Sequence, residues 1–231
     1  MQDIAHNLDA VRERIAAAAV RAGRDPKSVR LLAVSKAQPL AVIESAWGHG
    51  QVDFGENYLQ DASPKLTAFA GRTATWHFIG ALQSNKSREV AERFQWMHTL
   101  DRESIARRLS EQRPHGTEPL QVCLQVNVSG ESSKGGVTPE RVVELAQAVA
   151  GLGNLKLRGL MAIPAPAEGI EAQRKPFRVL RELLDDLKQR GHDVDTLSMG
   201  MSDDLEAAIL EGATIVRIGT AIFGPRAARH P

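Results

Sequence analysis

The sequence is short of cysteine and of any excess of charge, and each shortage excludes a class of protein. Cys123 is the only cysteine among 231 residues, so the chain has no disulfide framework and suits a reducing compartment. It stands in the apolar run 122–124, where we expect a core residue. Lys and Arg total 29 against 28 Asp and Glu, a net charge of +1, and there is no basic block or aromatic-interleaved stripe. We therefore expect no nucleic acid partner.

Long hydrophobic runs are also missing. No window approaches the roughly 18 to 20 consecutive apolar residues of a membrane-spanning helix, so we expect no membrane partner. The first twenty residues carry Asp3, Asp9 and Glu13 and contain no uninterrupted apolar region before a cleavage site. We therefore expect no secretion signal and a cytoplasmic protein. Hydrophobic residues still make up 42% of the chain, enough for the large core of a globular protein.

What is present is a regular alternation of helical and strand-like segments. Ile4, Leu8, Val11 and Ile15 recur at helical spacing and the pattern stops at Gly23, which predicts a helix at the start of the chain. Apolar runs of strand length follow, separated by segments with helical periodicity. The predicted strands are 29–36, 52–54, 76–80, 96–100, 121–128, 157–163, 196–201 and 214–223.

Eight strands that alternate with helices predict parallel βα units. At this length a closed barrel accommodates them better than an open sheet does, so we predict an α/β fold: a single (β/α)8 TIM barrel with an extra N-terminal helix, one domain over residues 1–231. The alternative is a doubly wound open sheet. No Gly-x-Gly-x-x-Gly follows the first predicted strand to support the dinucleotide crevice of that fold.

Lys36 is the first candidate site residue, because the active sites of such barrels lie at the C-terminal ends of the strands. It ends the first predicted strand and shares the parity of Leu32 and Val34, so it points into the barrel mouth if those two line the interior. Partial desolvation there would favour the neutral amine, which can attack an aldehyde. The alternative is a strand-end lysine whose amine extends to solvent.

A group of candidates for phosphate binding lies near the C-terminus. Ser202 stands where the N-cap of the next helix is predicted, and its hydroxyl with the following backbone N–H groups would form an anion site. Gly219 and Thr220 would add a close backbone approach and a second hydroxyl. Barrels often build phosphate sites after strands seven and eight, so the pattern favours phosphate binding. Helix capping alone is the alternative for Ser202.

The remaining polar candidates lie inside strands or on a loop. Arg217 alternates with Gly219 and is predicted to point into the same mouth, where either a carboxylate or a ring nitrogen of a cofactor could be its partner. His77 and His98 stand within predicted strands, where a histidine is usually a satisfied core or rim residue, and they suggest no metal site. Lys134 follows the fifth strand; we interpret it as a solvated loop lysine, with contact to a cofactor phosphate as the alternative.

Long segments of the chain resemble the pyridoxal phosphate homeostasis proteins, and together they cover nearly its whole length. The matching segments are VSK at 34–36, FGENY at 54–58, WHFIGALQSNK at 76–86, LRGLMAIP at 157–164 and SMGMSDDLEAAILEGATIVRIGTAIFG at 198–224. The resemblance implies a fold-type III barrel like the N-terminal domain of alanine racemase, with pyridoxal 5'-phosphate (PLP) as cofactor.

The resemblance also implies roles for individual residues. Lys36 would be the Schiff-base lysine and Arg217 would face the pyridine nitrogen. Asn57 would lie near the ring, and Met199 is carried over as a further cofactor-binding residue. The phosphate would be held by Ser202, Gly219 and Thr220.

A carrier is favoured over a catalyst. Arg217 donates a hydrogen bond and leaves a pyridine nitrogen unprotonated, which weakens PLP as an electron sink. The racemases of this barrel type add a second β domain and a tyrosine base from a partner subunit, whereas Tyr58 is the only tyrosine here. We expect a monomer that carries or buffers PLP for vitamin B6 homeostasis, with PLP-dependent apoenzymes as recipients.

Two enzyme hypotheses stay open. One is a PLP-dependent amino-acid racemase or lyase of fold-type III, which would need a base within reach of the substrate α-carbon proton. The other is a cofactor-free Schiff-base aldolase that acts on a sugar phosphate, since such barrels also combine a lysine with a phosphate site. Arg217 argues against the aldolase, because a sugar phosphate offers it no ring nitrogen.

Overall fold

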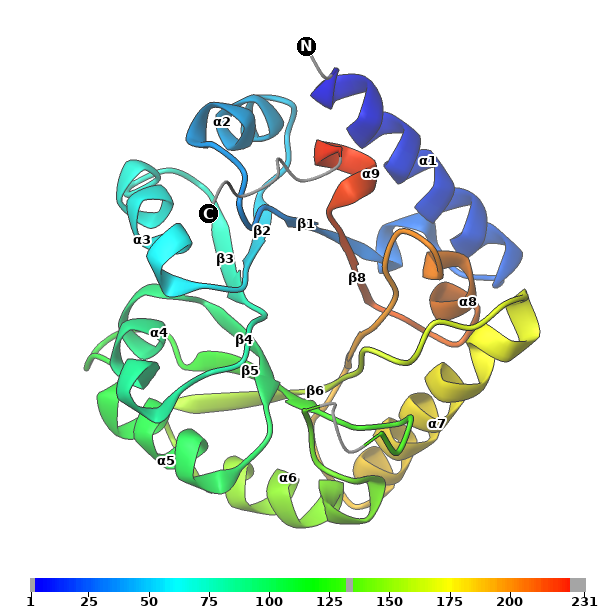
Figure 1. Cartoon of the computed structure of the whole chain (residues 1–231). Helices are drawn as coiled ribbons and strands as arrows, with labels where there is room; N and C mark the ends of the chain where they lie inside the picture. Colours follow the sequence, from blue (N-terminus) through cyan, green and yellow to red (C-terminus); the bar gives the residue numbers. More distant parts are fainter. Residues whose placement is uncertain (1–2, 132–134, 225–231) are drawn as a thin grey trace.

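The fold is a closed barrel of eight parallel strands, as predicted. The structure is a computed structural model that describes residues 3–131 and 135–224. Each strand pairs with the next along the chain, and β1 pairs with β8 to close the barrel (Figure 1). The strands are β1 (Arg30–Val34), β2 (Asp53–Glu56), β3 (Thr75–Phe78), β4 (Trp96–Leu100), β5 (Leu120–Gln125), β6 (Leu155–Met161), β7 (Thr196–Ser198) and β8 (Ile215–Ile218).

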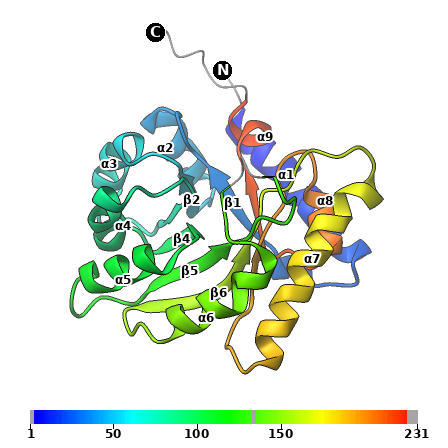
Figure 2. The same ribbon diagram turned by 60° about the horizontal axis from the view of Figure 1, so that its bottom comes forward.

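Helices surround the barrel on its outside, as Figure 2 shows from the side. They are α1 (Ile4–Arg21), α2 (Leu40–Gly48), α3 (Leu59–Ala68), α4 (Ser87–Arg93), α5 (Glu103–Gln112), α6 (Val142–Ala150), α7 (Ile170–Gln189), α8 (Leu205–Leu210) and α9 (Thr220–Phe223). Three short 3-10 helices, η1 (Pro26–Ser28), η2 (Ser84–Lys86) and η3 (Pro139–Arg141), complete the described elements. None of the helices in 3–131 and 135–224 is both long and apolar enough to cross a membrane.

The predicted N-terminal helix is α1. Its apolar face buries Ile4, Leu8, Val11 and Ile15, the residues whose spacing predicted it. It packs against α8 and α9, so it covers the outside of the barrel where those two helices are short (Figure 1). The helix ends at Arg21, two residues before Gly23, which adopts a positive φ of 68° as the chain turns towards β1.

The predicted strand 214–223 is too long. β8 covers Ile215–Ile218, and the residues from Thr220 to Phe223 form the one-turn helix α9. Both halves of the segment are mostly apolar, and Ile222 and Phe223 are buried like β8. A short apolar run has the same composition in either state. Gly219 separates the two elements and acts as the N-cap of α9. This break places Thr220 at the mouth of the barrel and not in its wall.

The core has two layers, because the strands are buried on both faces. Between the strands and the helices lies the larger layer. Inside the barrel lies a smaller cluster with contributions from six strand regions: Leu32, Ile79, Trp96, Cys123, Met161 and Ile215. Cys123 is therefore a core residue, as predicted, and its burial raises the pKa of the thiol to about 12.

Candidate functional site

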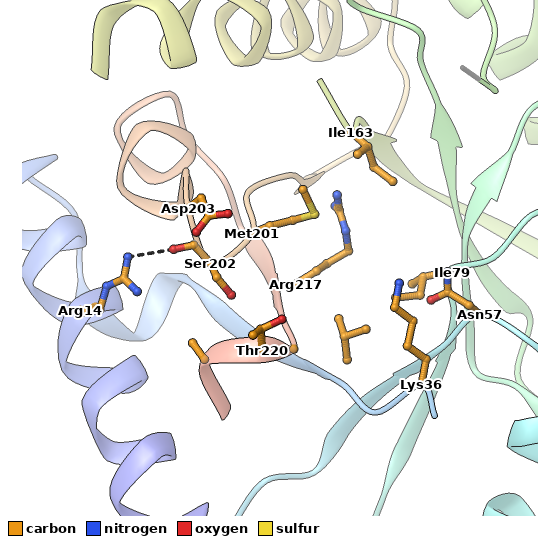
Figure 3. A pocket seen from close by; sticks show the side chains of 13 residues that line it. Arg14, Lys36, Asn57, Ile79, Ile163, Met201, Ser202, Asp203, Arg217 and Thr220 are labelled. Atoms are coloured by element: carbon orange, nitrogen blue, oxygen red, sulfur yellow. Dashed lines mark hydrogen bonds between the residues drawn. The ribbon is translucent and has the colours of Figure 1, made fainter. Parts of the chain in front are cut away.

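A cavity of about 510 Å³ opens at the C-terminal ends of the strands and has the size of a small-molecule site (Figure 3). Its lining comes mainly from the ends of β1 and β8 and from the segments that follow β2, β3, β6 and β7. The lining residues are Arg14, Val34, Lys36, Asn57, Ile79, Ile163, Met201, Ser202, Asp203, Arg217, Gly219, Thr220 and Ala221. Every candidate cofactor residue from the sequence except Met199 is in this set.

Lys36 lies on the cavity wall, two residues after β1 ends at Val34. Leu32 is fully buried in the interior cluster and Val34 packs against that cluster, so the parity that predicted an inward-facing Lys36 is correct. The next residue, Ala37, has a φ of 59°, a left-handed conformation that costs energy for a residue with a Cβ. The chain therefore turns sharply just after it has placed Lys36.

A buried ion pair holds the backbone before Lys36. The Lys65 ammonium donates to the Ser35 carbonyl oxygen at 2.8 Å and to Glu56 Oε1 at 2.7 Å. Ser35 Oγ donates to the same carboxylate oxygen at 2.6 Å. The side chains of Lys65 and Glu56 are 6% and 0% exposed. Burial raises the pKa of Glu56, although Lys65 opposes this. No sequence pattern predicts this pair, because its partners meet only through the packing of α3 on β1 and β2.

Arg217 lies inside the barrel wall with its guanidinium directed to backbone and hydroxyl oxygens. Its Nη1 donates to the Ser198 carbonyl at 2.6 Å and to Ser198 Oγ at 2.9 Å, and its Nη2 donates to the Ala162 carbonyl at 2.9 Å. Among the described residues no carboxylate forms a salt bridge with it. The alternative that Arg217 forms an ordinary salt bridge with a carboxylate is therefore wrong for these residues. Desolvation lowers the pKa of Arg217 to about 10, so it remains charged at neutral pH.

The candidate phosphate residues converge on one side of the cavity. Figure 3 shows Ser202 and Thr220 on that side, Lys36 and Asn57 on the other, and Arg217 between them. Gly219 lies directly before Thr220 at the end of β8. Arg14, from α1, was not anticipated by the sequence analysis; its Nη2 donates to the Ser202 carbonyl at 3.0 Å.

Ser202 is not a helix N-cap, contrary to the prediction. α8 begins at Leu205 and its N-cap is Asp204. The Asp204 carboxylate accepts a hydrogen bond from the Met201 backbone N–H at 2.6 Å, which closes the segment 201–204 into a turn before the helix can start. Ser202 lies within this turn and lines the cavity there.

Asn57 follows β2 and has an amide oxygen that is buried without a hydrogen-bond partner among the described residues. A buried orphan acceptor is uncommon, and at the wall of a cavity it suits a donor from a ligand. The backbone of Asn57 is packed closely against Gly80: a Cβ at position 80 would lie 1.9 Å from the Asn57 carbonyl oxygen. The glycine therefore sets how near the two strand ends approach.

Met199 occupies a different place from the one expected. It is fully buried in the core between barrel and helices and is not among the cavity-lining residues. Met201, two residues later, lines the cavity instead and is 40% exposed. The segment SMGMSDD repeats methionine at an interval of two, so spacing alone did not distinguish the core methionine from the cavity methionine.

The other polar candidates lie away from the cavity lining. His77 and His98 are completely buried inside the barrel, as satisfied core residues, and hydrogen bond to each other. Within the described part of the chain no three His, Cys, Asp or Glu side chains are grouped as a metal site would require. Tyr58 is 58% exposed and lines a neighbouring hollow of about 590 Å³. Lys134 lies outside the described residues.

Comparisons with known proteins place this geometry in a family. Residues 6–227 match the model of the alanine racemase N-terminal domain. A pyridoxal phosphate homeostasis protein of Pseudomonas aeruginosa is 60% identical over 98% of this chain and 97% of its own length. One from Escherichia coli is 54% identical, with 98% of both chains covered.

Comparison with solved structures agrees with the sequence comparisons. PipY of Synechococcus elongatus, solved with PLP bound, has a TM-score of 0.85 and 34% identity, covering 96% of this chain and all of that one. Alanine racemase from Corynebacterium glutamicum has a TM-score of 0.70 at 19% identity, and this chain covers 62% of it, so this likeness shows the fold alone. Identity of 60% across the full length decides the matter: the chain belongs to the pyridoxal phosphate homeostasis protein family.

Proposed function

We propose that the protein binds PLP in the 510 Å³ cavity, holds it as a Schiff base on Lys36, and carries or buffers it for PLP-dependent apoenzymes, so that it maintains vitamin B6 homeostasis in the cytoplasm. The observation that carries the proposal is the convergence of Lys36, Arg217 and two hydroxyl donors on one cavity. The names of the relatives and the PLP bound to PipY support the same ligand.

The donor set of the cavity fits each part of this cofactor. Ser202 and Thr220 supply hydroxyls and Gly219 a backbone open to close approach, which suits a phosphate. The Asn57 amide oxygen is a buried acceptor that still has a place for a donor. Ile79 and Ile163 offer apolar surface for a ring, and Lys36 offers the amine. When bound, PLP would supply an aldehyde for that amine and a ring that can withdraw electrons.

Arg217 favours storage over turnover. A guanidinium donates hydrogen bonds but in practice transfers no proton, so it would leave the pyridine nitrogen unprotonated and limit electron withdrawal by the ring. Tyr58, the only tyrosine of the sequence, is not among the residues that line the cavity. We propose that the protein acts as a monomer that releases its cofactor, with amino-acid racemase or lyase activity as the alternative to be tested.

The test is covalent trapping of PLP. The purified protein is incubated with PLP, separated from excess cofactor, reduced with borohydride and digested for peptide mapping. We expect a single reduced adduct at Lys36, no adduct in Lys36→Ala, and an unchanged adduct in the exposed control Lys188→Ala. Retained Schiff-base absorbance in Lys36→Ala would refute the attachment site.

Two further measurements separate the proposal from its alternatives. Light scattering of the loaded protein reports whether it is a monomer. An assay for amino-acid racemisation and elimination on the same sample is expected to show no turnover above the rate of PLP in solution; turnover that depends on Lys36 would establish the enzyme instead.

A further inference from the structure

A row of polar side chains crosses the inside of the barrel, where such folds normally carry layers of branched apolar residues. Asp53 Oδ1 lies 3.0 Å from His77 Nε2, and His77 Nδ1 lies 2.9 Å from His98 Nε2. His98 Nδ1 in turn lies 2.7 Å from Ser198 Oγ, which accepts from Arg217 Nη1 at 2.9 Å. The row begins at the first residue of β2 and ends at Arg217 on the cavity.

The chemistry of the groups gives this row one direction of donation. Arg217 can only donate, so Ser198 Oγ accepts from it and has its own proton available for His98 Nδ1. His98 Nδ1 is then an acceptor, so the ring proton of a neutral His98 is on Nε2 and is donated to His77 Nδ1. By the same logic His77 carries its proton on Nε2 and donates it to Asp53, which as a carboxylate can only accept. In this arrangement each hydrogen bond of the row joins one donor to one acceptor.

The surroundings keep both rings neutral. Burial is the largest cause that lowers the pKa of His77 and of His98. The charged groups that face His77 are Asp53 and Arg30, and those that face His98 are Arg217 and Arg30. The Trp96 ring, from the cluster inside the barrel, stacks on the His77 ring with 5.4 Å between centroids. Neutral rings are the form that the one-directional pattern requires.

We propose that Asp53, His77, His98 and Ser198 form a relay that positions the Arg217 guanidinium and brings the influence of the Asp53 carboxylate to it across the barrel. The inference rests on the proposed function, since it makes the relay a tuning device for the PLP ring. The relay fixes Arg217 Nη1 on Ser198, while Nη2 is fixed on the Ala162 carbonyl. Hydrogen bonds in such a chain polarise one another, so the carboxylate makes each acceptor along it stronger.

Asp53 is well suited to polarise the hydrogen bonds of the relay. Its side chain is 13% exposed, and Arg30 Nη1 lies 3.6 Å from its Oδ1. Both residues begin their strands, so they lie at the end of the barrel opposite the cavity. Within the described residues no carboxylate forms a salt bridge with Arg217, and Asp204 acts on its charge only through space. The relay is therefore a hydrogen-bonded route from a carboxylate to the guanidinium. These four residues are positioning residues: none of them lines the cavity.

The first measurement uses cofactor-free protein and so does not depend on PLP binding. Long-range ¹⁵N–¹H NMR distinguishes the two tautomers of a neutral histidine. We expect His77 and His98 both to carry the proton on Nε2 from about pH 6 to pH 8. The exposed His115 serves as the comparison signal. His77→Gln, His98→Gln and His115→Gln assign the signals. A proton on Nδ1 of either buried ring, or titration of either in this range, would overturn the relay.

The second measurement breaks the relay at Ser198. Ser198→Ala removes the hydroxyl but keeps the backbone carbonyl that Arg217 also uses. We expect the His98 signals to shift in the cofactor-free protein, and the loaded protein to show a shifted PLP absorption band and about tenfold weaker retention of PLP, the scale of one hydrogen bond to a charged group. Ser198→Thr, which keeps a hydroxyl at this position, is expected to restore the His98 signals, the absorption band and the retention of PLP.

Asp53→Asn is the second variant, since it keeps the size of the side chain and removes the charge. An amide can donate as well as accept, so both directions of the relay become possible, and we expect the His77 and His98 signals to become mixtures of tautomers. Unchanged absorption, retention and histidine signals in both Ser198→Ala and Asp53→Asn would refute the inference. If the wild type fails to bind PLP, the proposed function fails, while the tautomers still decide whether the relay exists.

Discussion

At the scale of single residues, Arg217 is the group that we propose to act most strongly on a bound PLP. Its guanidinium is fixed by three hydrogen bonds and stays charged at neutral pH because its lowered pKa is still about 10. We predict that Arg217→Gln keeps covalent attachment at Lys36 but shifts the absorption band of bound PLP and its pH titration. Spectrophotometric titration of the reduced and unreduced protein measures both.

The control for this variant is Arg190→Gln, which removes an exposed arginine paired with Asp186 on α7. It is expected to leave the band and the titration unchanged. If Arg217→Gln behaves like Arg190→Gln, the guanidinium does not influence the cofactor.

Gly80 supports a second prediction. In Gly80→Ala the new Cβ would lie 1.9 Å from the Asn57 carbonyl oxygen, so the backbone of Asn57 must move away. We expect PLP retention to weaken by more than tenfold and the free energy of unfolding to fall by about 1 to 3 kcal/mol, as for other overpacked sites. Equilibrium dialysis and urea denaturation measure the two effects.

The matched glycine control is Gly48→Ala. A Cβ at this position of α2 meets nothing within 4 Å, so both quantities should be preserved. Equal PLP retention in Gly80→Ala and Gly48→Ala would show that the approach of Asn57 to β3 does not shape the site.

At the scale of elements, the Glu56–Lys65 pair ties α3 to β1 and β2 beneath Lys36. Removing one partner leaves a buried charge without compensation, so we predict that Lys65→Met lowers the free energy of unfolding by about 3 to 5 kcal/mol. The double variant Lys65→Met with Glu56→Gln is expected to recover most of this loss, since no buried charge remains. Urea denaturation of both variants and of the exposed control Lys188→Met provides the comparison; a double variant no more stable than the single one would contradict it.

The presence and order of the elements were predictable from the sequence, but not all of their ends. The eight strands and α1 were found because apolar spacing alone identifies them, but the end of strand eight was wrong because a short buried run reads the same as strand or helix. Ser202 was misplaced as an N-cap for a different reason. The hydrogen bond from Met201 to Asp204 moved the start of α8 to Leu205, and either Ser or Asp is an acceptable cap by composition.

At the scale of the whole molecule, the buried histidines make stability depend on pH. The folded pKa values of His77 and His98 are lowered, so between those values and about 6.5 the unfolded chain binds more protons than the folded one. Stability is therefore lost as the pH falls below about 6.5. We predict a slope of up to about 1.4 kcal/mol per pH unit for each histidine between about pH 6.5 and 5.

Urea denaturation across this range tests the slope. His98→Gln should flatten the profile relative to the wild type, and Gly48→Ala, which removes no titratable group, should not. If His98→Gln keeps the full slope, the acid sensitivity comes from other groups and the buried histidine titrates alike in both states.

The candidate site was partly predictable because its residues follow strand ends in recognisable segments. Lys36, Arg217 and Thr220 could be assigned to one mouth once the barrel was inferred. The contacts that support them could not be assigned. His98 and Ser198 are 100 residues apart and meet only across the closed barrel, and no local pattern records such a meeting. Sequence reasoning thus found most of the residues that line the cavity and missed those packed behind them.

The place of Trp96 gives the protein an internal optical reporter. Its indole belongs to the interior cluster, which also contains Ile79 and is packed by Val34, and both of these line the cavity. Ultraviolet emission from that ring overlaps the absorption of a Schiff base of PLP, so loading of the cavity should quench it by energy transfer. The tryptophan emission of the unlabelled chain would then report binding and release of PLP in real time. Apoenzymes added to the loaded protein would serve as recipients of the cofactor.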